Sequence, residues 1–424
     1  MVDTMRGVPA ARGLEPRPRA GGATQSDLRG HNLAAITRLL SGARSPLSRA
    51  DIAQSSGMGR ATVSRLTQEL IDAALVTEMA PIGTEQRGRP ATPLQIARRT
   101  VAGIGLEVNV WYVAARALDL AGDVLGQFRI SGDFAHQPAA DTLRLLGDEA
   151  ARLVVRLRAE HIDVAGACLA IPGMVSEDGG DVAVAPNLDW RDLRPLDHLG
   201  ADWTASHVPT AARNDADLRA TAEACVRPGR LVEDASFLYV AGDIGIGGAL
   251  VREGQIDSGE HGWAGEVGHV SVEPDGPPCH CGSTGCLETY AGQASLMAAA
   301  GLSPRDDVDA LIARLAAGDA TAARAVARAG WALGVAIANV LNVADLSRVV
   351  LGTSLGRLLP WLEEPMNAQL RRRVLGAGRR DLVVTQGAIL DAPACTGGAL
   401  AVLNGIVDDP AGYVAARSAA GSRR

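Results

Sequence analysis

The stretch CHCGSTGCLE, residues 279–288, holds three of the six cysteines in this 424-residue chain. The other three, Cys168, Cys225 and Cys395, are widely separated. The N-terminal part lacks the apolar segment of a secretory signal, and no run of about 18 apolar residues predicts a membrane span. We therefore expect a cytoplasmic protein with reduced thiols, in which clustered cysteines bind a metal ion instead of forming disulfides.

The spacing of the clustered cysteines suits one tetrahedral zinc ion. Cys279, Cys281 and Cys286 offer three thiolate ligands, and His269, ten residues before the first of them, is the natural fourth. His280 is the rival for the fourth place, although adjacent residues in a Cys-x-Cys turn point apart, and His261 is a weaker rival. Because the protein would supply all four ligands, we predict a structural zinc with no open catalytic position. The alternative is three unligated cysteines in a glycine-rich loop.

Charge is distributed unevenly along the chain. The net charge is −7, yet residues 1–100 carry 14 arginines against 8 acidic residues. Hydrophobic residues make up 47% and charged residues 21%, as in an ordinary globular protein. A basic N-terminal part on an acidic body indicates a polyanionic partner at one end of the molecule. The alternative is a solvated surface with uneven charge.

The N-terminal part divides into a tail and a helical domain. Residues 1–27 are rich in Gly, Pro, Arg and Ala without periodic apolar positions, which predicts a disordered tail. Residues 28–97 are predicted to form a winged helix-turn-helix domain. Ala53, Gly57 and Val63 have the spacing that this motif needs, because a small residue lets two helices approach, glycine permits the turn and an apolar residue locks the second helix.

The second helix of this motif, predicted over 59–71, would lie in the major groove of DNA. Its exposed face carries the predicted DNA-binding residues Arg60, Thr62, Ser64, Arg65 and Gln68. The segment GTEQRGRPATPLQI, residues 83–96, is predicted to form the wing, with Arg87 and Arg89 at its tip for minor-groove or phosphate contacts. The alternative is a helical hairpin that is packed for structural reasons alone.

The rest of the chain, residues 98–424, has an α/β pattern. VAGIGLEVNVWYVAARALDLAGDVLGQF, residues 101–128, predicts consecutive strands, and 138–159 predicts an amphipathic helix. A second cycle begins at FLYVAGDIGIGGALV, residues 237–251, and includes a long alanine-rich helix at 320–343. This order predicts two βββαβα-like halves with a cleft between them.

Three segments form a recognisable pattern: GEVGH at 265–269 followed by CHCGSTGCLE, LAIPGMVSEDGGDVAVAPNLDW at 169–190, and RNDAD at 213–217. Together they resemble the ROK family, which groups bacterial sugar kinases with sugar-responsive repressors. The resemblance covers roughly residues 100–408, and the preceding helix-turn-helix is similar to the arrangement in the repressor branch. It implies a two-lobed actin-like, ribonuclease H-like ATPase-type fold, as in sugar kinases, with a zinc loop near 269–286.

The resemblance also implies a sugar site. Its residues would be Gly173, Asn214, Asp215, Glu266, His269 and Glu288. The Asn-Asp pair would bind a sugar hydroxyl, and Asp215 would be the general base if kinase activity were retained. His269 would contact the sugar while it ligates zinc through its other nitrogen, and Glu288 would close the site. For Asp215 and Glu266 taken singly, the alternative is a solvated carboxylate or a helix cap.

The turns that hold ATP phosphates in the kinases are altered in this sequence. In the first turn Glu107 takes the position of an Asp, and a Gly-Gly-Thr sequence is replaced by Asn109, Val110 and Trp111. A bulky Trp and a branched Val cannot form the narrow, NH-lined turn that phosphates require. The second turn keeps its glycines, at 245, 247 and 248, but has Ile244 where a Thr is expected.

These features favour a regulator over an enzyme. We expect a repressor that binds a pseudo-palindromic operator as a homodimer or homotetramer and senses a sugar or sugar phosphate, with no membrane partner. One alternative is an ATP-dependent sugar kinase with an accessory DNA-binding domain. The other is a regulator that responds to a protein partner and keeps a vestigial sugar site.

Overall fold

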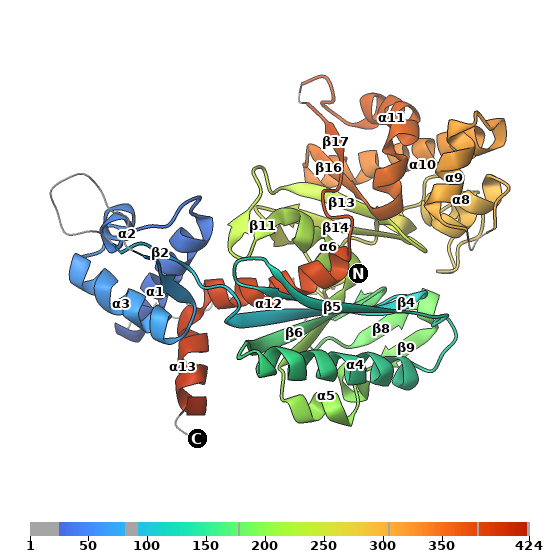
Figure 1. Cartoon of the computed structure of the whole chain (residues 1–424). Coiled ribbons are helices and arrows are strands. Elements are labelled where there is room, and N and C mark those ends of the chain that lie inside the picture. Colours follow the sequence, from blue (N-terminus) through green and yellow to red (C-terminus); the bar gives the residue numbers. More distant parts are fainter. Residues whose placement is uncertain (1–24, 81–91, 177–178, 304–305, 380, 422–424) are drawn as a thin grey trace, which may run out of the picture.

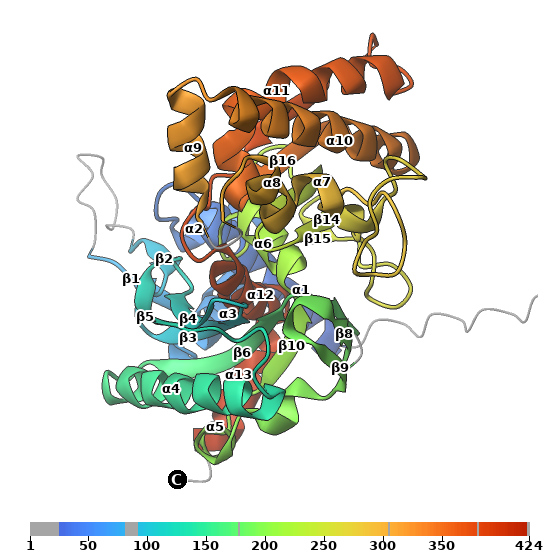
Figure 2. The ribbon, with the colours of Figure 1, turned by 90° about the vertical axis from the view of Figure 1, so that its right-hand side faces the viewer.

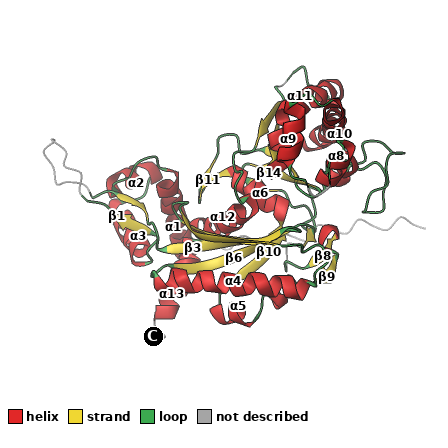
Figure 3. Cartoon of the chain, turned by 45° about the vertical axis from the view of Figure 1, so that its right-hand side comes forward, coloured by secondary structure: helices red, strands yellow, loops and turns green. Residues whose placement is uncertain are grey.

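The computed structural model describes residues 25–80, 92–176, 179–303, 306–379 and 381–421. The described chain forms a helical head followed by two lobes, each built on a five-stranded sheet (Figures 1 and 3). Most of the predicted disordered tail, residues 1–24, lies outside the described residues. The last three residues of that predicted tail are helical, because the first helix begins at Gln25.

Three helices of the head form the predicted helix-turn-helix core: α1 Gln25–Gly42, α2 Arg49–Ser56 and α3 Arg60–Asp72. Ser48 caps α2, since its side chain accepts from the Asp51 N–H while the Asp51 carboxylate accepts from the Ser48 N–H. Gly57 ends α2 with a φ of 71°, in the left-handed region that favours glycine. Val63 of α3 is fully buried, as the predicted locking residue should be.

The structure contains the base of the predicted wing. Strands β1 Val76–Glu78 and β2 Leu94–Ile96 pair antiparallel, with Val76 opposite Ile96. The predicted tip, with Arg87 and Arg89, lies outside the described residues. The structure therefore supports a hairpin after α3 and leaves its tip contacts as a prediction.

The first lobe contains a five-stranded sheet in the order β10-β6-β3-β4-β5. Its elements are β3 Val101–Val108, β4 Tyr112–Asp119, β5 Val124–Ser131, α4 Ala139–Ala159, β6 Asp163–Ile171 and β10 Thr210–Asn214. Between β6 and β10 the chain forms a small three-stranded sheet and a short helix: β7 Met174–Val175, β8 Val182–Ala185, β9 Trp190–Leu193 and α5 Ala201–Ser206. The apolar residues of β3, including Ile104 and Leu106, are fully buried in the core of this lobe.

The second lobe repeats this topology. Its sheet has the order β15-β14-β13-β16-β17. The strands are β13 Phe237–Gly242, β14 Ile246–Arg252, β15 Gln255–Ile256, β16 Arg348–Gly352 and β17 Val383–Gln386. The helices are α7 Glu288–Ala291, α8 Gln293–Ala299, α9 Val308–Ala316, α10 Ala320–Ala344 and α11 Thr353–Arg373. In both lobes three antiparallel strands precede two parallel ones, so the predicted pair of βββαβα-like halves is confirmed.

Two helices lie between the lobes, α6 Asp215–Ala224 and α12 Pro393–Asp408 (Figures 1 and 2). They approach each other closely because Gly397 of α12 has no side chain, and a Cβ there would collide with the Leu218 carbonyl. After α6 the chain forms a small hairpin, β11 Cys225–Arg227 and β12 Arg230–Leu231. Helix α6 is thus enclosed by both lobes and by α12.

The head shares its hydrophobic core with the body. Leu33, Ile36 and Leu40 of α1 belong to the same buried cluster as Leu403 of α12. The last helix, α13 Pro410–Gly421, returns to pack beside α1 (Figure 1). Across the same junction Arg38 and Asp408 form an ion pair at 2.7 Å. The boundary that we predicted at residues 97–98 therefore separates two parts that pack together extensively.

Helix α10 is long and apolar enough to cross a membrane by length and composition alone. However, 61% of its most apolar window is buried inside the protein, and α11 packs along it. Apolar residues all round a helix are expected when it lies in a core. We read α10 as the core helix of the second lobe.

Candidate functional site: a cavity between the lobes and a Cys-His cluster beside it

A cavity opens between the two lobes, where the Pro172-Gly173 loop of the first lobe faces the turn 243–248 of the second. All six residues that the resemblance implies for a sugar site line this cavity: Gly173, Asn214, Asp215, Glu266, His269 and Glu288. They come from segments far apart in the sequence. The fold thus brings together the complete set of residues that the sequence predicted for a sugar site.

Asn214 organises the floor of the cavity. Its Oδ1 caps α6 by accepting from the N–H groups of Ala216 and Asp217 at 2.7 and 3.1 Å. Its Nδ2 donates to the Gly173 carbonyl at 2.8 Å. A Cβ at Gly173 would collide with the Val184 carbonyl of β8, so only glycine fits there. The contacts in the structure therefore make Asn214 a residue that fixes Asp215 and the Pro-Gly loop in position.

Arg219 is a site residue that sequence reasoning missed. It lies one turn after Asp215 on α6, with only 2% of its side chain exposed. Its Nη2 lies 3.1 Å from Glu107 Oε1, 3.1 Å from Asp215 Oδ2 and 3.2 Å from Asp243 Oδ2. Glu107 belongs to the first lobe and Asp243 to the second. One guanidinium thus joins α6 to both lobes.

Burial and charge act against each other in this network. Burial raises the pKa of Glu107 and of Asp215, and the charge of Arg219 opposes both shifts. Burial alone would lower the pKa of Arg219, but the surrounding carboxylates outweigh it and hold that pKa above its ordinary value. The guanidinium therefore stays charged and compensates the carboxylates around it.

The two turns at the inner end of the cavity are filled by groups of the protein itself. In the first, the Trp111 N–H donates to Asn109 Oδ1 at 3.0 Å, and Asn109 Nδ2 donates to Asp243 Oδ2 at 2.9 Å. In the second, the Ile246 N–H donates to Glu288 Oε2 at 2.9 Å. The backbone N–H of Ile246, which could otherwise donate to a phosphate, is thus bound to the carboxylate of Glu288.

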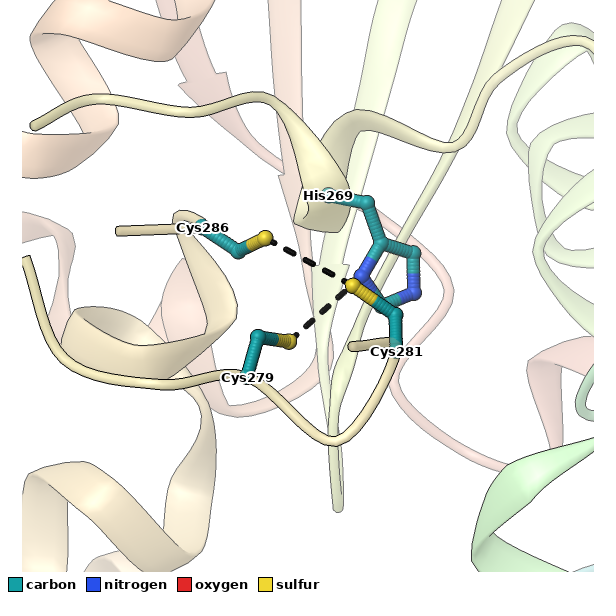
Figure 4. Close-up of side chains that lie close together, drawn as sticks. All are labelled: His269, Cys279, Cys281 and Cys286. Carbon is teal, nitrogen blue, oxygen red and sulfur yellow. Dashed lines mark hydrogen bonds between the residues drawn. The ribbon is translucent and has the colours of Figure 1, made fainter. Parts of the chain in front are cut away.

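The metal-ligand candidates form a compact cluster beside the cavity (Figure 4). The potential ligand atoms of His269, Cys279, Cys281 and Cys286 all lie within 4.8 Å of one another. His269 Nδ1 lies 3.8 Å from Cys279 Sγ, and Cys281 Sγ lies 3.8 Å from Cys286 Sγ. A soft thiolate set with one imidazole, free of carboxylates, suits a tetrahedral zinc ion.

The geometry separates the two nitrogens of His269. Nδ1 points to the cysteines, while Nε2 lies 3.9 Å from Glu266 Oε2 on the side of the cavity. Of the rival histidines, His280 lines the cavity and His261 packs its ring against Trp263, and neither belongs to the cluster found among the described residues. The cluster can therefore connect a metal ion directly to the cavity wall.

The predicted DNA-reading face lies on α3. Arg60, Ser64, Arg65 and Gln68 are exposed there, and Thr62 is half-buried. Arg65 pairs with Glu69 at 2.6 Å, and Arg29 of α1 binds the same carboxylate at 2.5 Å. These contacts hold the two arginines in place along the exposed edge of the head.

Helix α6 connects the cavity to the head. Its N-terminus carries Asn214 and Asp215, and its C-terminus leads directly into β11. Arg227 of β11 donates to the Ser41 and Ala43 carbonyls at the end of α1, at 2.9 and 2.6 Å. Ser41 Oγ in turn donates to the Pro228 carbonyl at 2.6 Å. A displacement of α6 at the cavity would therefore reach the head through a short chain of hydrogen bonds.

The fold and the site together define a DNA-binding head on a body of the sugar kinase type. A model of the ROK family matches residues 103–405, and a model of the IclR helix-turn-helix domain matches residues 32–78. The chain belongs to the ROK family. The predicted resemblance, and the predicted combination of a helix-turn-helix head with a sugar kinase fold, are thereby confirmed.

Relatives of two kinds resemble the chain. It is 26% identical to the xylose repressor of Bacillus subtilis over 336 residues, which are 78% of this chain and 84% of that protein. It is also 26% identical to the N-acetylglucosamine repressor of Escherichia coli O157:H7 over 399 residues, 89% of this chain and 94% of that one. A glucokinase of Halalkalibacterium halodurans is 29% identical over 283 residues, 62% of this chain and 83% of the enzyme.

The solved structures that resemble the chain are also of two kinds, a transcriptional regulator and kinases. A crystal structure of a ROK family transcriptional regulator, a homologue of the E. coli MLC protein, has a TM-score of 0.76 at 25% identity and covers 91% of this chain and 99% of its own. A ROK family glucokinase from Streptomyces griseus has a TM-score of 0.58 at 23% identity and covers 70% of this chain and 98% of its own, which shows a shared fold. The repressors are thus similar over more of the chain than the kinases.

Proposed function

We propose that this protein is a cytoplasmic transcriptional repressor that binds operator DNA through its head and senses a sugar in the cavity between its lobes. The proposal rests on the connection between the cavity and the head. Helix α6 begins at the cavity and leads into the hairpin β11–β12, and this hairpin is hydrogen-bonded to α1 of the head. The similarity to xylose and N-acetylglucosamine repressors over both head and body supports it. Carboxylates and amides in the cavity suit the hydroxyl groups of a sugar.

The metal cluster would bind a structural zinc ion through His269, Cys279, Cys281 and Cys286. When bound, zinc would crosslink the loop and fix the His269 ring by occupying Nδ1, which leaves Nε2 for the sugar. Glu288 begins α7 two residues after Cys286, so the ion would set the position of two cavity residues. The donor set leaves no place for a catalytic water, in keeping with a structural role.

The environment of Asp215 speaks against sugar phosphorylation. The carboxylate that would act as base is instead held in an ion pair, with its Oδ2 3.1 Å from Arg219 Nη2. The turn at Asn109 carries a Trp, and the glycine-rich turn binds Glu288 through its N–H. These features support a protein that binds a sugar without transferring phosphate to it.

The response would follow from linkage between two sites. A sugar that binds one arrangement of the lobes better than another shifts their equilibrium, and α6 and Arg227 pass the difference to α1. Helix-turn-helix proteins bind two half-sites as dimers, so we propose a homodimer or homotetramer on a pseudo-palindromic operator. The effector would change the spacing of the two heads and with it the operator affinity.

The proposal is tested by measuring operator affinity with and without sugars on the zinc-loaded full-length chain. We expect xylose, glucose or N-acetylglucosamine to change the operator Kd by about 5- to 150-fold, the usual range of allosteric coupling. Glu266→Gln should abolish this response while the operator affinity without sugar is kept, because Glu266 lies in the cavity far from α3. A response that Glu266→Gln leaves intact would contradict a sensing role for the cavity.

The kinase alternative needs a separate measurement. Incubation with ATP, magnesium and each sugar should give no sugar phosphate above the level of an Asp215→Asn variant. Turnover that disappears in Asp215→Asn would identify an enzyme and overturn the assignment. Operator binding in the same preparations shows that the protein is folded.

For the head, we expect Arg65→Ala to weaken operator binding and to reduce the slope of log K against log salt by about 1, since one phosphate contact is lost. The measurement is a titration of labelled operator DNA at several salt concentrations. Arg152→Ala is the matched control, because Arg152 is also an exposed arginine paired with a glutamate on its own helix, but on α4 of the body. An unchanged salt slope for Arg65→Ala would remove Arg65 from the DNA interface.

A further inference from the structure

The charges in the cavity decide which kind of sugar it can accept. Four carboxylates line it: Asp215, Asp243, Glu266 and Glu288. Among the described lining residues the one guanidinium is that of Arg219, and the sequence contains no lysine. The cavity is therefore rich in negative charge.

The positive charge of Arg219 is already in use. Its Nη2 is shared by Glu107, Asp215 and Asp243 at 3.1 to 3.2 Å, so one cation stands against three anions. Of the two lining imidazoles, His269 directs Nδ1 to the cysteines, and His280 lies within the Cys-x-Cys turn. A phosphate group that entered here would face more carboxylates than cations.

The glycine-rich turn at 243–248 does not make up for the lack of positive charge around a phosphate group. Backbone N–H groups in such turns bind phosphates in many proteins. Here the Ile246 N–H donates to Glu288 Oε2, and Gly245 lies so close to that oxygen that a Cβ would collide with it. The carboxylate of Glu288 thus lies where a phosphate oxygen would have to bind.

The hydrogen-bonding capacity of the cavity carboxylates also favours a free sugar over its phosphate ester. Ionised carboxylates only accept hydrogen bonds, and a phosphate dianion also only accepts them. A sugar hydroxyl donates a hydrogen and accepts others, so it can satisfy the cavity carboxylates.

We infer that the effector is an unphosphorylated sugar and that Asp243 and Glu288, which line the cavity, exclude its phosphate ester. This inference rests on the proposed sensing function and specifies its ligand class. Asp243 acts as a specificity-determining residue, since its carboxylate lines the cavity and must share the one lining guanidinium with Asp215 and with the buried Glu107.

The test compares matched ligand pairs by calorimetry on the zinc-loaded full-length protein: glucose with glucose 6-phosphate, N-acetylglucosamine with its 6-phosphate, and xylose with xylose 5-phosphate. We expect the free sugar of at least one pair to bind, and its phosphate to bind at least about 100-fold more weakly. A phosphate that binds as tightly as its free sugar, or more tightly, would overturn the inference and leave the sensing function standing. If no member of any pair binds or changes operator affinity, both the sensing function and this inference are overturned.

A charge variant separates electrostatic exclusion from simple shape. Asp243→Asn keeps the hydrogen-bonding shape and removes one charge, so the ratio of the two dissociation constants should fall about tenfold. Asp257→Asn is the control, because Asp257 is half exposed on the second lobe, 3.7 Å from Arg252, outside the cavity lining. If Asp243→Asn leaves the ratio at the wild-type value, charge at this position does not set the specificity.

Discussion

Replacing Cys286 with serine should yield a protein that no longer retains zinc and no longer responds to sugars. Cys286 is fully buried, and its Sγ lies among the other three candidate ligands. Removing a residue that only orients a metal ligand lowers metal affinity by up to about 100-fold. Loss of a thiolate ligand itself should lower the zinc affinity by more than that. Metal analysis of the purified full-length chain after dialysis measures the zinc content directly.

The sugar response should fail for a structural reason. Without the ion, His269 loses the contact that fixes its Nδ1, and the loop that leads to Glu288 loses its crosslink. Cys225→Ala is the matched control, because Cys225 is a buried cysteine of β11 outside the cluster. The control should retain one zinc ion per chain. A Cys286→Ser protein that keeps stoichiometric zinc would rule out the proposed ligand set.

Replacing Arg219 with methionine should destabilise the protein by about 3–5 kcal/mol, the usual cost of removing one partner from a buried ion pair. The variant leaves Glu107, which is 1% exposed, without its counter-charge. Burial already raises the pKa of Glu107, so a lost cation would raise it further and favour the neutral acid. Equilibrium unfolding in denaturant measures the loss of stability.

A second substitution tests whether the charge of Glu107 causes the loss of stability in Arg219→Met. Removing the stranded charge with Glu107→Gln in the Arg219→Met background should restore part of the lost stability, by more than about 1 kcal/mol. Arg152→Met, at an exposed arginine of α4, should change stability by less than about 0.5 kcal/mol. Equal stabilities of the single and double variants would show that the charge of Glu107 is not what Arg219 compensates.

The grouping of His269 with the three cysteines, and the residues that line the cavity, were predictable because local spacing carries their signal. Three cysteines within eight positions limit the geometry of the loop, and His269 comes from a motif only ten residues before it. The helix-turn-helix was predictable for a similar reason, since Ser48 and Gly57 mark the ends of α2 by their own chemistry. In each case the deciding interactions join residues that are near in sequence.

Arg219 and Arg227 were missed because their roles depend on contacts between distant segments. On α6 an arginine one turn after an aspartate has the pattern of an ordinary exposed i,i+4 ion pair. Only the enclosure of α6 by two lobes and α12 makes that pair a buried network. Asn214 has a local signal that the sequence analysis left unused, because asparagine before a helix is a favoured N-cap.

The return of α12 and α13 to the head has a consequence for how the protein is made. Arg38 and Asp408 are paired although 370 positions separate them. During synthesis the head leaves the ribosome before α12 and α13 exist, so α1 at first lacks the contacts that these two helices make with it. An interrupted polypeptide would therefore carry an incomplete head. The complete packing of α1 in the head therefore depends on completion of the body.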